Sequence, residues 1–246
     1  FMLKTAYEIL PSLVGSEMCI RDRKEMMRPI TMFVTGGAVL LKAGETPDNV
    51  ARKLLSLAVA WAKAGLDVVQ IREHWMTDRN LLELVRMMVS RLAAFDTKVV
   101  VNDRPDIAVA ANAHGIHFKD EPLDVKRVLE YGSQDWLISR SVHDLETAKE
   151  ICGDGYVDYL VAGTVKTTSS RAGKRLIGFG GLQEIASAVS TPVLAIGGLE
   201  FSDSAEIQRS AGSGLAGIRL FMNGDRFTDE ERSFQIDKCR EVFGSI

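Results

Sequence analysis

The side chains most suited to chemistry in this 246-residue sequence include an arginine set among polar neighbours. In the segment Gln70-Ile71-Arg72-Glu73-His74, the residues Gln70, Arg72 and His74 are spaced two apart. Because side chains alternate between the two faces of a strand, these three would point the same way. An arginine beside an amide and an imidazole is suited to binding a phosphate or diphosphate. The alternative is that Arg72 only pairs with Glu73 or another carboxylate.

A second polar pair, Asn102-Asp103, follows a run of three valines. An amide can hydrogen-bond a heteroaromatic ring, and a carboxylate is a ligand that Mg²⁺ prefers. The pair therefore indicates a ring-binding and magnesium-binding position. The alternative is that Asp103 only caps a helix, because Pro105 and the helical run Ile107–Ala111 follow it.

Ser141 and His143 invite interpretation as a nucleophile and its base. We do not adopt it, because no third group that would orient the histidine is identifiable. Ser141 also stands just before Asp144, where a helix could begin. His117, which ends another apolar run, is interpreted as a hydrogen-bonded structural histidine.

Two segments could hold a phosphate group. Residues 163–171 are rich in hydroxyls, including Thr168 and Ser170, and end on Arg171. Gly197 and Gly198 follow an apolar run, and their backbone amides could approach an anion without obstruction from a Cβ atom. A solvated polar loop and a tight turn are the respective alternatives.

The elements that must position these residues alternate along the chain from Ile30 onward. Short apolar runs typical of buried parallel strands are separated by segments with a 3.6-residue apolar period, such as Leu81, Leu84, Val85, Met88 and Leu92. Eight strands are expected, at Thr31–Thr35, Asp67–Arg72, Lys98–Asn102, Gly115–Phe118, Trp136–Ser141, Asp158–Ala162, Pro192–Ile196 and Ala216–Phe221.

Eight strand-helix units without a compositional break predict a single-domain α/β fold, the (β/α)8 TIM barrel, over residues 29–246. The polar residues described above then fall at the C-terminal ends of strands, where such barrels place their active sites. Residues 1–28 are expected to form a non-core extension. Within them, PSLVGSEMCIRDR resembles translated sequencing-adapter read-through.

The composition favours a small-molecule ligand in the cytoplasm. A net charge of -3 and the lack of a basic, aromatic-rich face argue against nucleic acid, and no apolar run is long enough to span a membrane. Three cysteines at irregular spacing predict neither disulfides nor a zinc site. Together with the two candidate phosphate-binding segments, this composition makes phosphorylated small molecules the expected partners. Assembly into a homo-oligomer stays open.

Taken in order, the strings VQIRE, VNDRPDIAVAANAHGIHF, SVHDLETA, TTSSR, PVLAIGG and GLAGIRLFM resemble the thiamine phosphate synthase and TenI family. The synthases join a pyrimidine methyl diphosphate to a thiazole phosphate and release diphosphate. The resemblance implies catalytic roles for Arg72, Asn102, Ser141 and Arg171, and substrate binding by Gln70, His74, Thr168, Ser170, Gly197 and Gly198. It also implies a Mg²⁺ ion on Asp103, with Glu121 or Asp120 as a further ligand.

The sequence departs from the synthase pattern at four positions. His74 replaces a lysine, Pro122 a second magnesium aspartate, Arg171 a lysine, and Met222 a serine. The TenI branch, a thiazole tautomerase that needs no Mg²⁺, shares the string RSVH, but its catalytic histidine falls at Thr164. The resemblance therefore favours the synthase, with the tautomerase and a non-catalytic phosphate-binding barrel as alternatives.

Overall fold

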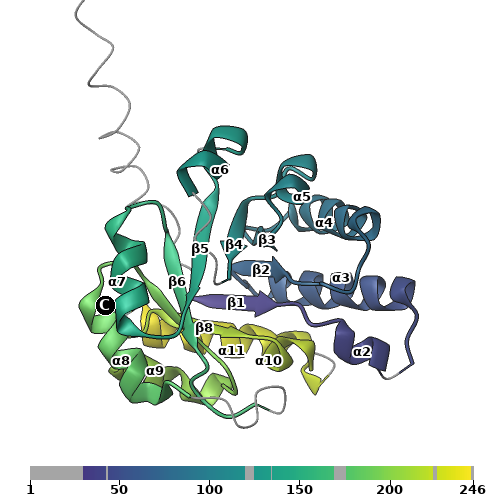
Figure 1. Cartoon of the computed structure of the whole chain (residues 1–246). Coiled ribbons are helices and arrows are strands. Elements are labelled where there is room, and N and C mark those ends of the chain that lie inside the picture. Colours follow the sequence, from purple (N-terminus) through teal and green to yellow (C-terminus); the bar gives the residue numbers. More distant parts are fainter. Residues whose placement is uncertain are drawn as a thin grey trace, which may run out of the picture.

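The computed structural model describes residues 30–42, 44–119, 125–133, 135–168, 176–223 and 226–244. Eight parallel strands pair in sequence order, and the last pairs with the first, so the sheet closes into a barrel (Figure 1). This confirms the predicted (β/α)8 fold. The strands are β1 Thr31–Val34, β2 Val68–Ile71, β3 Lys98–Asn102, β4 Gly115–Phe118, β5 Leu137–Val142, β6 Tyr159–Gly163, β7 Val193–Ile196 and β8 Gly214–Gly217.

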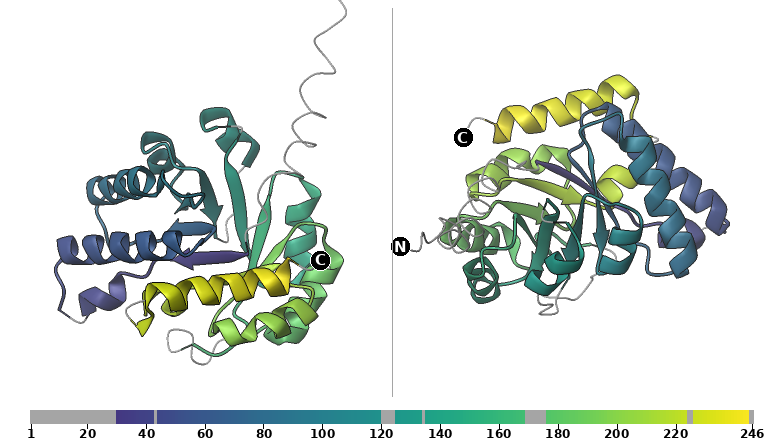
Figure 2. Two further views of the ribbon diagram at one scale, coloured as in Figure 1. Left: turned by 180° about the vertical axis from the view of Figure 1, so that it is seen from behind. Right: turned by 90° about the horizontal axis from the view of Figure 1, so that it is seen from above.

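Helices connect the strands and lie around the outside of the barrel (Figure 2). In α3, the Thr46 side chain accepts a hydrogen bond from the Asn49 amide, and Pro47 occupies the first helical position. The helices are α2 Ala38–Lys42, α3 Pro47–Lys63, α4 Asp78–Leu92, α5 Pro105–Ala110, α6 Val125–Tyr131, α7 Leu145–Gly153, α8 Gly178–Ala188, the 3-10 turn η2 Phe201–Asp203, α9 Ser204–Arg209, α10 Arg219–Met222 and α11 Asp229–Phe243.

The alternation of side chains along each strand divides the apolar residues into two layers. Met32 and Val68 belong to a cluster inside the barrel, whereas Phe33 and Val69 belong to the larger cluster between the strands and the helices. Since β2 and β3 pair Gln70 with Val100, the even-numbered residues of β2 and β3 face inward. The same register places the polar side chains of Gln70 and Asn102 inside the barrel, near the C-terminal ends of β2 and β3.

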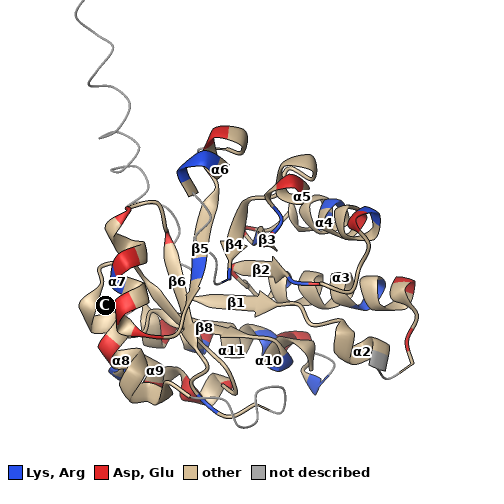
Figure 3. Cartoon of the chain, in the orientation of Figure 1, with Lys and Arg blue, Asp and Glu red and all other residues tan. Residues whose placement is uncertain are grey.

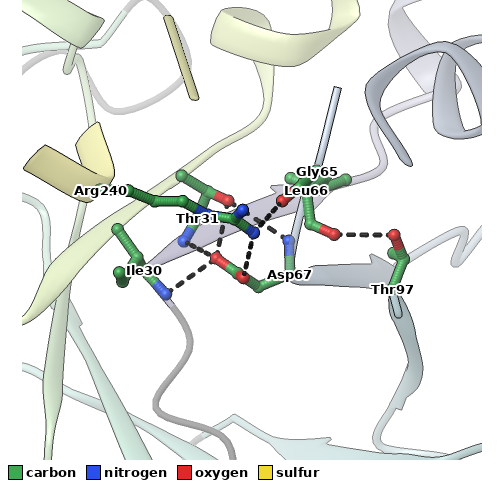
Figure 4. Close-up of polar contacts among 7 residues, drawn as sticks. All are labelled: Ile30, Thr31, Gly65, Leu66, Asp67, Thr97 and Arg240. Carbon is green, nitrogen blue, oxygen red and sulfur yellow. Dashed lines mark hydrogen bonds and ion pairs between the residues drawn. The ribbon is translucent and has the colours of Figure 1, made fainter. Parts of the chain in front are cut away.

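A polar clasp centred on Asp67 lies on the N-terminal face of the barrel (Figure 4). The Asp67 carboxylate accepts hydrogen bonds from the amides of Ile30 and Thr31, at 3.0 and 2.8 Å, and from the Thr31 hydroxyl. Arg240 of α11 reaches the same carboxylate and donates to the Gly65 carbonyl at 2.7 Å. The clasp joins β1, β2 and α11 on the face opposite the strand ends that carry the predicted site.

One predicted strand is wrong in its extent. The last strand was expected at Ala216–Phe221, but β8 ends at Gly217, and the following apolar residues form the short helix α10. Phe221 packs edge-on against Trp61 of α3, with ring centroids 5.0 Å apart. A short apolar run fits a buried helix as well as a strand, so its periodicity could not separate the two.

Charged residues of both signs are spread over the helices, without a basic stripe in the view of Figure 3. The strands consist mostly of uncharged residues in the same view. Within the described ranges, no helix is both long and apolar enough to cross a membrane.

Candidate functional site

A row of hydrogen-bonded polar side chains crosses β2 and β3 at the C-terminal mouth of the barrel. Gln70 Nε2 donates to Asn102 Oδ1 at 2.7 Å, and Asn102 Nδ2 donates to Asp103 Oδ2 at 2.7 Å. Gln70 and Asn102 are both buried. The structure therefore brings together three of the predicted site residues, and the two bonds fix which way the Asn102 amide points.

Asp103 does not act as the helix cap that the sequence allowed as an alternative. Helix α5 has Arg104 at its N-cap position and no side-chain cap hydrogen bond. Asp103 adopts a positive φ of 55°, and its Oδ1 accepts from the Lys119 amide at 2.9 Å. This places the carboxylate at the ends of β3 and β4, and each oxygen keeps a lone pair for a further partner.

Arg72 lies half-buried at the end of β2 and forms no salt bridge with other described residues. The alternative of pairing with Glu73 is not adopted by the structure. Both carboxylate oxygens of Glu73 instead accept from the Gly37 amide at 3.0 Å, and the Trp75 indole donates at 2.6 Å. The Arg72 guanidinium is therefore available for an anionic ligand.

His74 is an exposed residue in the electrostatic neighbourhood of Arg72 and Asp103. Partial burial lowers its pKa below the ordinary value, and the nearby Arg72 charge lowers it further, while Asp103 opposes the shift. The free site thus favours a neutral imidazole. A bound diphosphate would reverse this balance by adding negative charge.

The serine and histidine residues of β4 and β5 pair differently from the arrangement weighed in the sequence. Ser141 Oγ lies 3.0 Å from Nε2 of His117, whose Nδ1 lies 2.9 Å from Ser139 Oγ. His143 instead contacts the Gly163 carbonyl. Ser141 does not begin α7 either, because Asp144 caps that helix by accepting from the Thr147 amide at 2.8 Å.

The glycine pair after β7 forms a turn packed against the loop after β6. Gly197 and Gly198 have φ values of 107° and 65°, which side chains rarely allow. A Cβ atom on Gly198 would lie 2.6 Å from the Thr167 carbonyl oxygen. The turn is therefore tight, as the alternative held, and the Gly198 amide donates no hydrogen bond to another described residue.

An ion pair ties this loop to the segment after the glycine turn. Lys166 Nζ lies 2.6 Å from Asp203 of η2, and the Lys166 amide donates to the Gly197 carbonyl at 2.9 Å. Thr168 lies half-buried at the end of the described part of this loop. The sequence reasoning did not single out Lys166, whose only signal was its position in a hydroxyl-rich loop.

The end of β8 changes which residues follow this strand at the mouth of the barrel. Ile218 and Arg219 follow the strand directly, whereas Met222 is the last residue of α10 and packs against the outer apolar cluster. Assigning the expected serine position to Met222 assumed a longer strand and is corrected by this boundary. Arg219 is exposed at the start of α10.

Several predicted residues lie outside the described ranges. These are Ser170, Arg171 and Glu121, together with Asp120 and Pro122. Ser139 is a further site residue that the sequence reasoning missed. Its signal was the spacing of two from Ser141 in the same strand, which places both side chains inside the barrel.

This geometry defines a class of protein: an α/β barrel with polar side chains and an arginine at the C-terminal mouth, where such barrels place their active sites. The family model described as thiamine monophosphate synthase matches residues 43–221. The chain therefore belongs to the thiamine monophosphate synthase family.

Individual relatives agree with this assignment. The chain is 33% identical over 180 residues to a thiamine-phosphate synthase of Haloquadratum walsbyi, covering 72% of this chain and 80% of the relative. It is 31% identical over 189 residues to the enzyme of the same name from Haloarcula marismortui, covering 75% and 86%. The solved thiamine phosphate pyrophosphorylase from Pyrococcus furiosus superposes with a TM-score of 0.71 at 25% identity, covering 87% of this chain and 97% of that one.

Proposed function

We propose that this protein is a thiamine-phosphate synthase in thiamine biosynthesis. The thiazole ring nitrogen forms a bond to the methylene carbon of hydroxymethylpyrimidine diphosphate, while the carbon–oxygen bond to diphosphate breaks. The leaving diphosphate takes the bonding electron pair. Relatives that carry this name and match at least 72% of the chain support the proposal.

The observation that carries the proposal is the Gln70–Asn102–Asp103 row beside Arg72. Gln70 and Asn102 offer amide groups to a pyrimidine ring, and Arg72 offers a cation to its diphosphate. Charge on the departing diphosphate is the main quantity that such a site must stabilise. The glycine turn, with Thr168 in the neighbouring loop, suits the smaller thiazole phosphate. Ser170 and Arg171 stay predicted contributors.

Asp103 is the proposed protein ligand of a Mg²⁺ ion. Its oxygens each hold one hydrogen-bond donor and retain acceptor capacity. Groups of three or more His, Cys, Asp or Glu side chains that could hold a metal are absent from the described residues. This suits Mg²⁺, which is commonly bound through one or two carboxylates with the substrate phosphates and water completing its shell. Glu121 stays a candidate second ligand.

We further propose that the protein acts in a reducing cytoplasm. The two cysteines in the described chain, Cys152 and Cys239, are both free thiols. Burial raises the pKa of each, which keeps the thiols protonated and unreactive.

A thiazole tautomerase is the second candidate within the family resemblance. Its catalytic histidine would fall at Thr164, which is buried at 6% exposure. A threonine hydroxyl is a poor proton acceptor near neutral pH, so that chemistry lacks its base. The site therefore favours the synthase.

The direct test combines the purified protein with hydroxymethylpyrimidine diphosphate, thiazole phosphate and Mg²⁺, and detects thiamine phosphate by mass spectrometry. Arg72→Ala should lower kcat/KM by about 100-fold, because a cation that stabilises the leaving group is lost. Arg79→Ala is the matched control, since Arg79 is exposed on α4. No product at high concentrations of wild-type protein would overturn the proposal.

A further inference from the structure

Three polar side chains form a continuous hydrogen-bonded row inside the barrel. Ser139 Oγ lies 2.9 Å from His117 Nδ1, and His117 Nε2 lies 3.0 Å from Ser141 Oγ. Ser139 is fully buried, and Ser141 is partly exposed toward the mouth. Both ring nitrogens of His117 are therefore engaged, one toward the interior and one toward the site.

Tyr159 stands behind this row. It is the register partner of Ser139 on β6, it is fully buried, and its hydroxyl has no hydrogen-bond partner that meets ordinary geometry. Burial raises the pKa of Tyr159 well above its usual value, and the Ser139 hydroxyl opposes the shift. The phenol thus keeps its proton and needs an acceptor, and we infer that its register partner Ser139 is that acceptor.

The direction of the row follows from the protons that each group can carry. A neutral imidazole has one donor and one acceptor, so Nδ1 and Nε2 cannot both donate. If the Ser139 oxygen accepts from Tyr159, the Ser139 proton points to Nδ1, and the imidazole proton lies on Nε2. Nε2 then donates to Ser141, whose own proton turns toward the mouth.

We propose that Ser139 is a positioning residue that holds His117 as the Nε2–H tautomer, so that Ser141 presents its hydroxyl as a hydrogen-bond donor to a ring nitrogen of the substrate. The identity of that ring rests on the proposed function. The tautomer itself is a property of the free protein.

The test is nitrogen-15 NMR of the full chain labelled at its four histidines, with the His117 signals assigned from a His117→Asn spectrum. The wild-type protein should show a single Nε2–H tautomer at His117. Ser139→Ala should give a mixture of tautomers, and Tyr159→Phe should shift the population part of the way. Ser204→Ala is the matched control, because Ser204 is another buried serine, whose hydroxyl donates to the Phe201 carbonyl at 2.7 Å.

A binding measurement distinguishes a positioning role of Ser139 from a general loss of structure in the variant. By calorimetry, Ser139→Ala should bind hydroxymethylpyrimidine diphosphate about tenfold more weakly, because one hydrogen bond loses its direction. Its affinity for thiazole phosphate should be unchanged. Should Ser139→Ala fail to fold, Tyr159→Phe provides the same two readouts.

An Nδ1–H tautomer in the wild-type protein would overturn the proposal, as would a Ser139→Ala spectrum identical to that of wild type. Failure of the wild-type protein to bind the pyrimidine would refute the synthase function instead. In that case the expected tautomer would still establish the role of Ser139 toward His117.

Discussion

Gln70 on β2 donates its side-chain amide to the side-chain oxygen of Asn102 on β3, across a distance of 2.7 Å. This bond leaves the Asn102 nitrogen directed at Asp103, also at 2.7 Å. The interaction between two uncharged residues therefore controls the surroundings of the carboxylate that we propose as the magnesium ligand.

Replacing Asn102 with alanine should remove both hydrogen bonds of the row. The Gln70 amide and the Asp103 carboxylate would then each lose a partner, which costs about 1–3 kcal/mol per group. We expect kcat/KM for the pyrimidine diphosphate to fall by about 100-fold in steady-state assays. Asn49→Ala, at a side chain that bonds Glu45 and Arg52 and no residue of the row, should leave it unchanged. Equal activities of the two variants would contradict the role assigned to the row.

Replacing Gly198 with alanine should damage the turn after β7 in two ways. Alanine at a φ of 65° costs about 1–2 kcal/mol, and its Cβ would meet the Thr167 carbonyl oxygen at 2.6 Å. Gly155→Ala is the matched control, because Gly155 has a φ of 71° and no atom within 4 Å of the added Cβ.

Chemical denaturation should show a larger loss of stability for Gly198→Ala than for Gly155→Ala. Calorimetry should show weaker thiazole phosphate binding only for Gly198→Ala. An unchanged affinity of Gly198→Ala for thiazole phosphate would mean that the turn does not bind this ligand.

Replacing Asp67 with alanine should weaken the barrel without affecting the mouth. The amides of Ile30 and Thr31 would lose a charged acceptor, so the free energy of unfolding should fall by about 2–4 kcal/mol. Asp96→Ala, on the same face but at an exposed carboxylate, should cost less than about 0.5 kcal/mol. Thermal unfolding measures the loss of stability. Unchanged KM values of Asp67→Ala for both substrates would show that the mouth is unaffected.

Glu73 should make the folded protein less stable as its carboxyl ionises. Burial raises the pKa of Glu73 above 4.5, so the folded state binds this proton more tightly than the unfolded state does. The free energy of unfolding contributed by Glu73 must therefore fall as the pH rises from 4.5 to the folded pKa, and then level off.

Urea denaturation of the wild-type protein and Glu73→Gln from about pH 4 to about pH 7.5 measures this contribution as a difference between the two proteins. Other titrating groups cancel in that difference. A difference that increases with pH would mean that the hydrogen bonds from Gly37 and Trp75 outweigh the burial of the carboxylate.

Much of the architecture was accessible from the sequence because apolar period and strand length are local properties. The buried face of α4, with Leu81, Leu84 and Val85, follows the predicted spacing. The end of β8 was not accessible, because Phe221 is buried by aromatic partners from distant elements, Trp61 and Phe201. Local periodicity contains no information about such partners.

In the candidate site, too, some features follow from the local sequence and others only from the tertiary structure. Strand alternation placed Gln70 on the inner face, and strand order brought Asn102 beside it. The pairing of His117 with Ser139 and Ser141 depends on the register between β4 and β5, which no single segment specifies. The positive φ of Asp103, which takes its carboxylate away from the N-terminus of α5, is likewise set by the tertiary structure.

The clasp around Asp67 also determines how the protein could be attached to a surface. Arg240 holds the last turns of α11 against Gly65 and Asp67, on the same side of the barrel as the start of β1. A tether added beyond α11 would emerge from that side, with the mouth turned toward the solvent. Immobilised protein of this kind should retain full access to its ligands, whereas a tether placed in the loop after β6 would obstruct them.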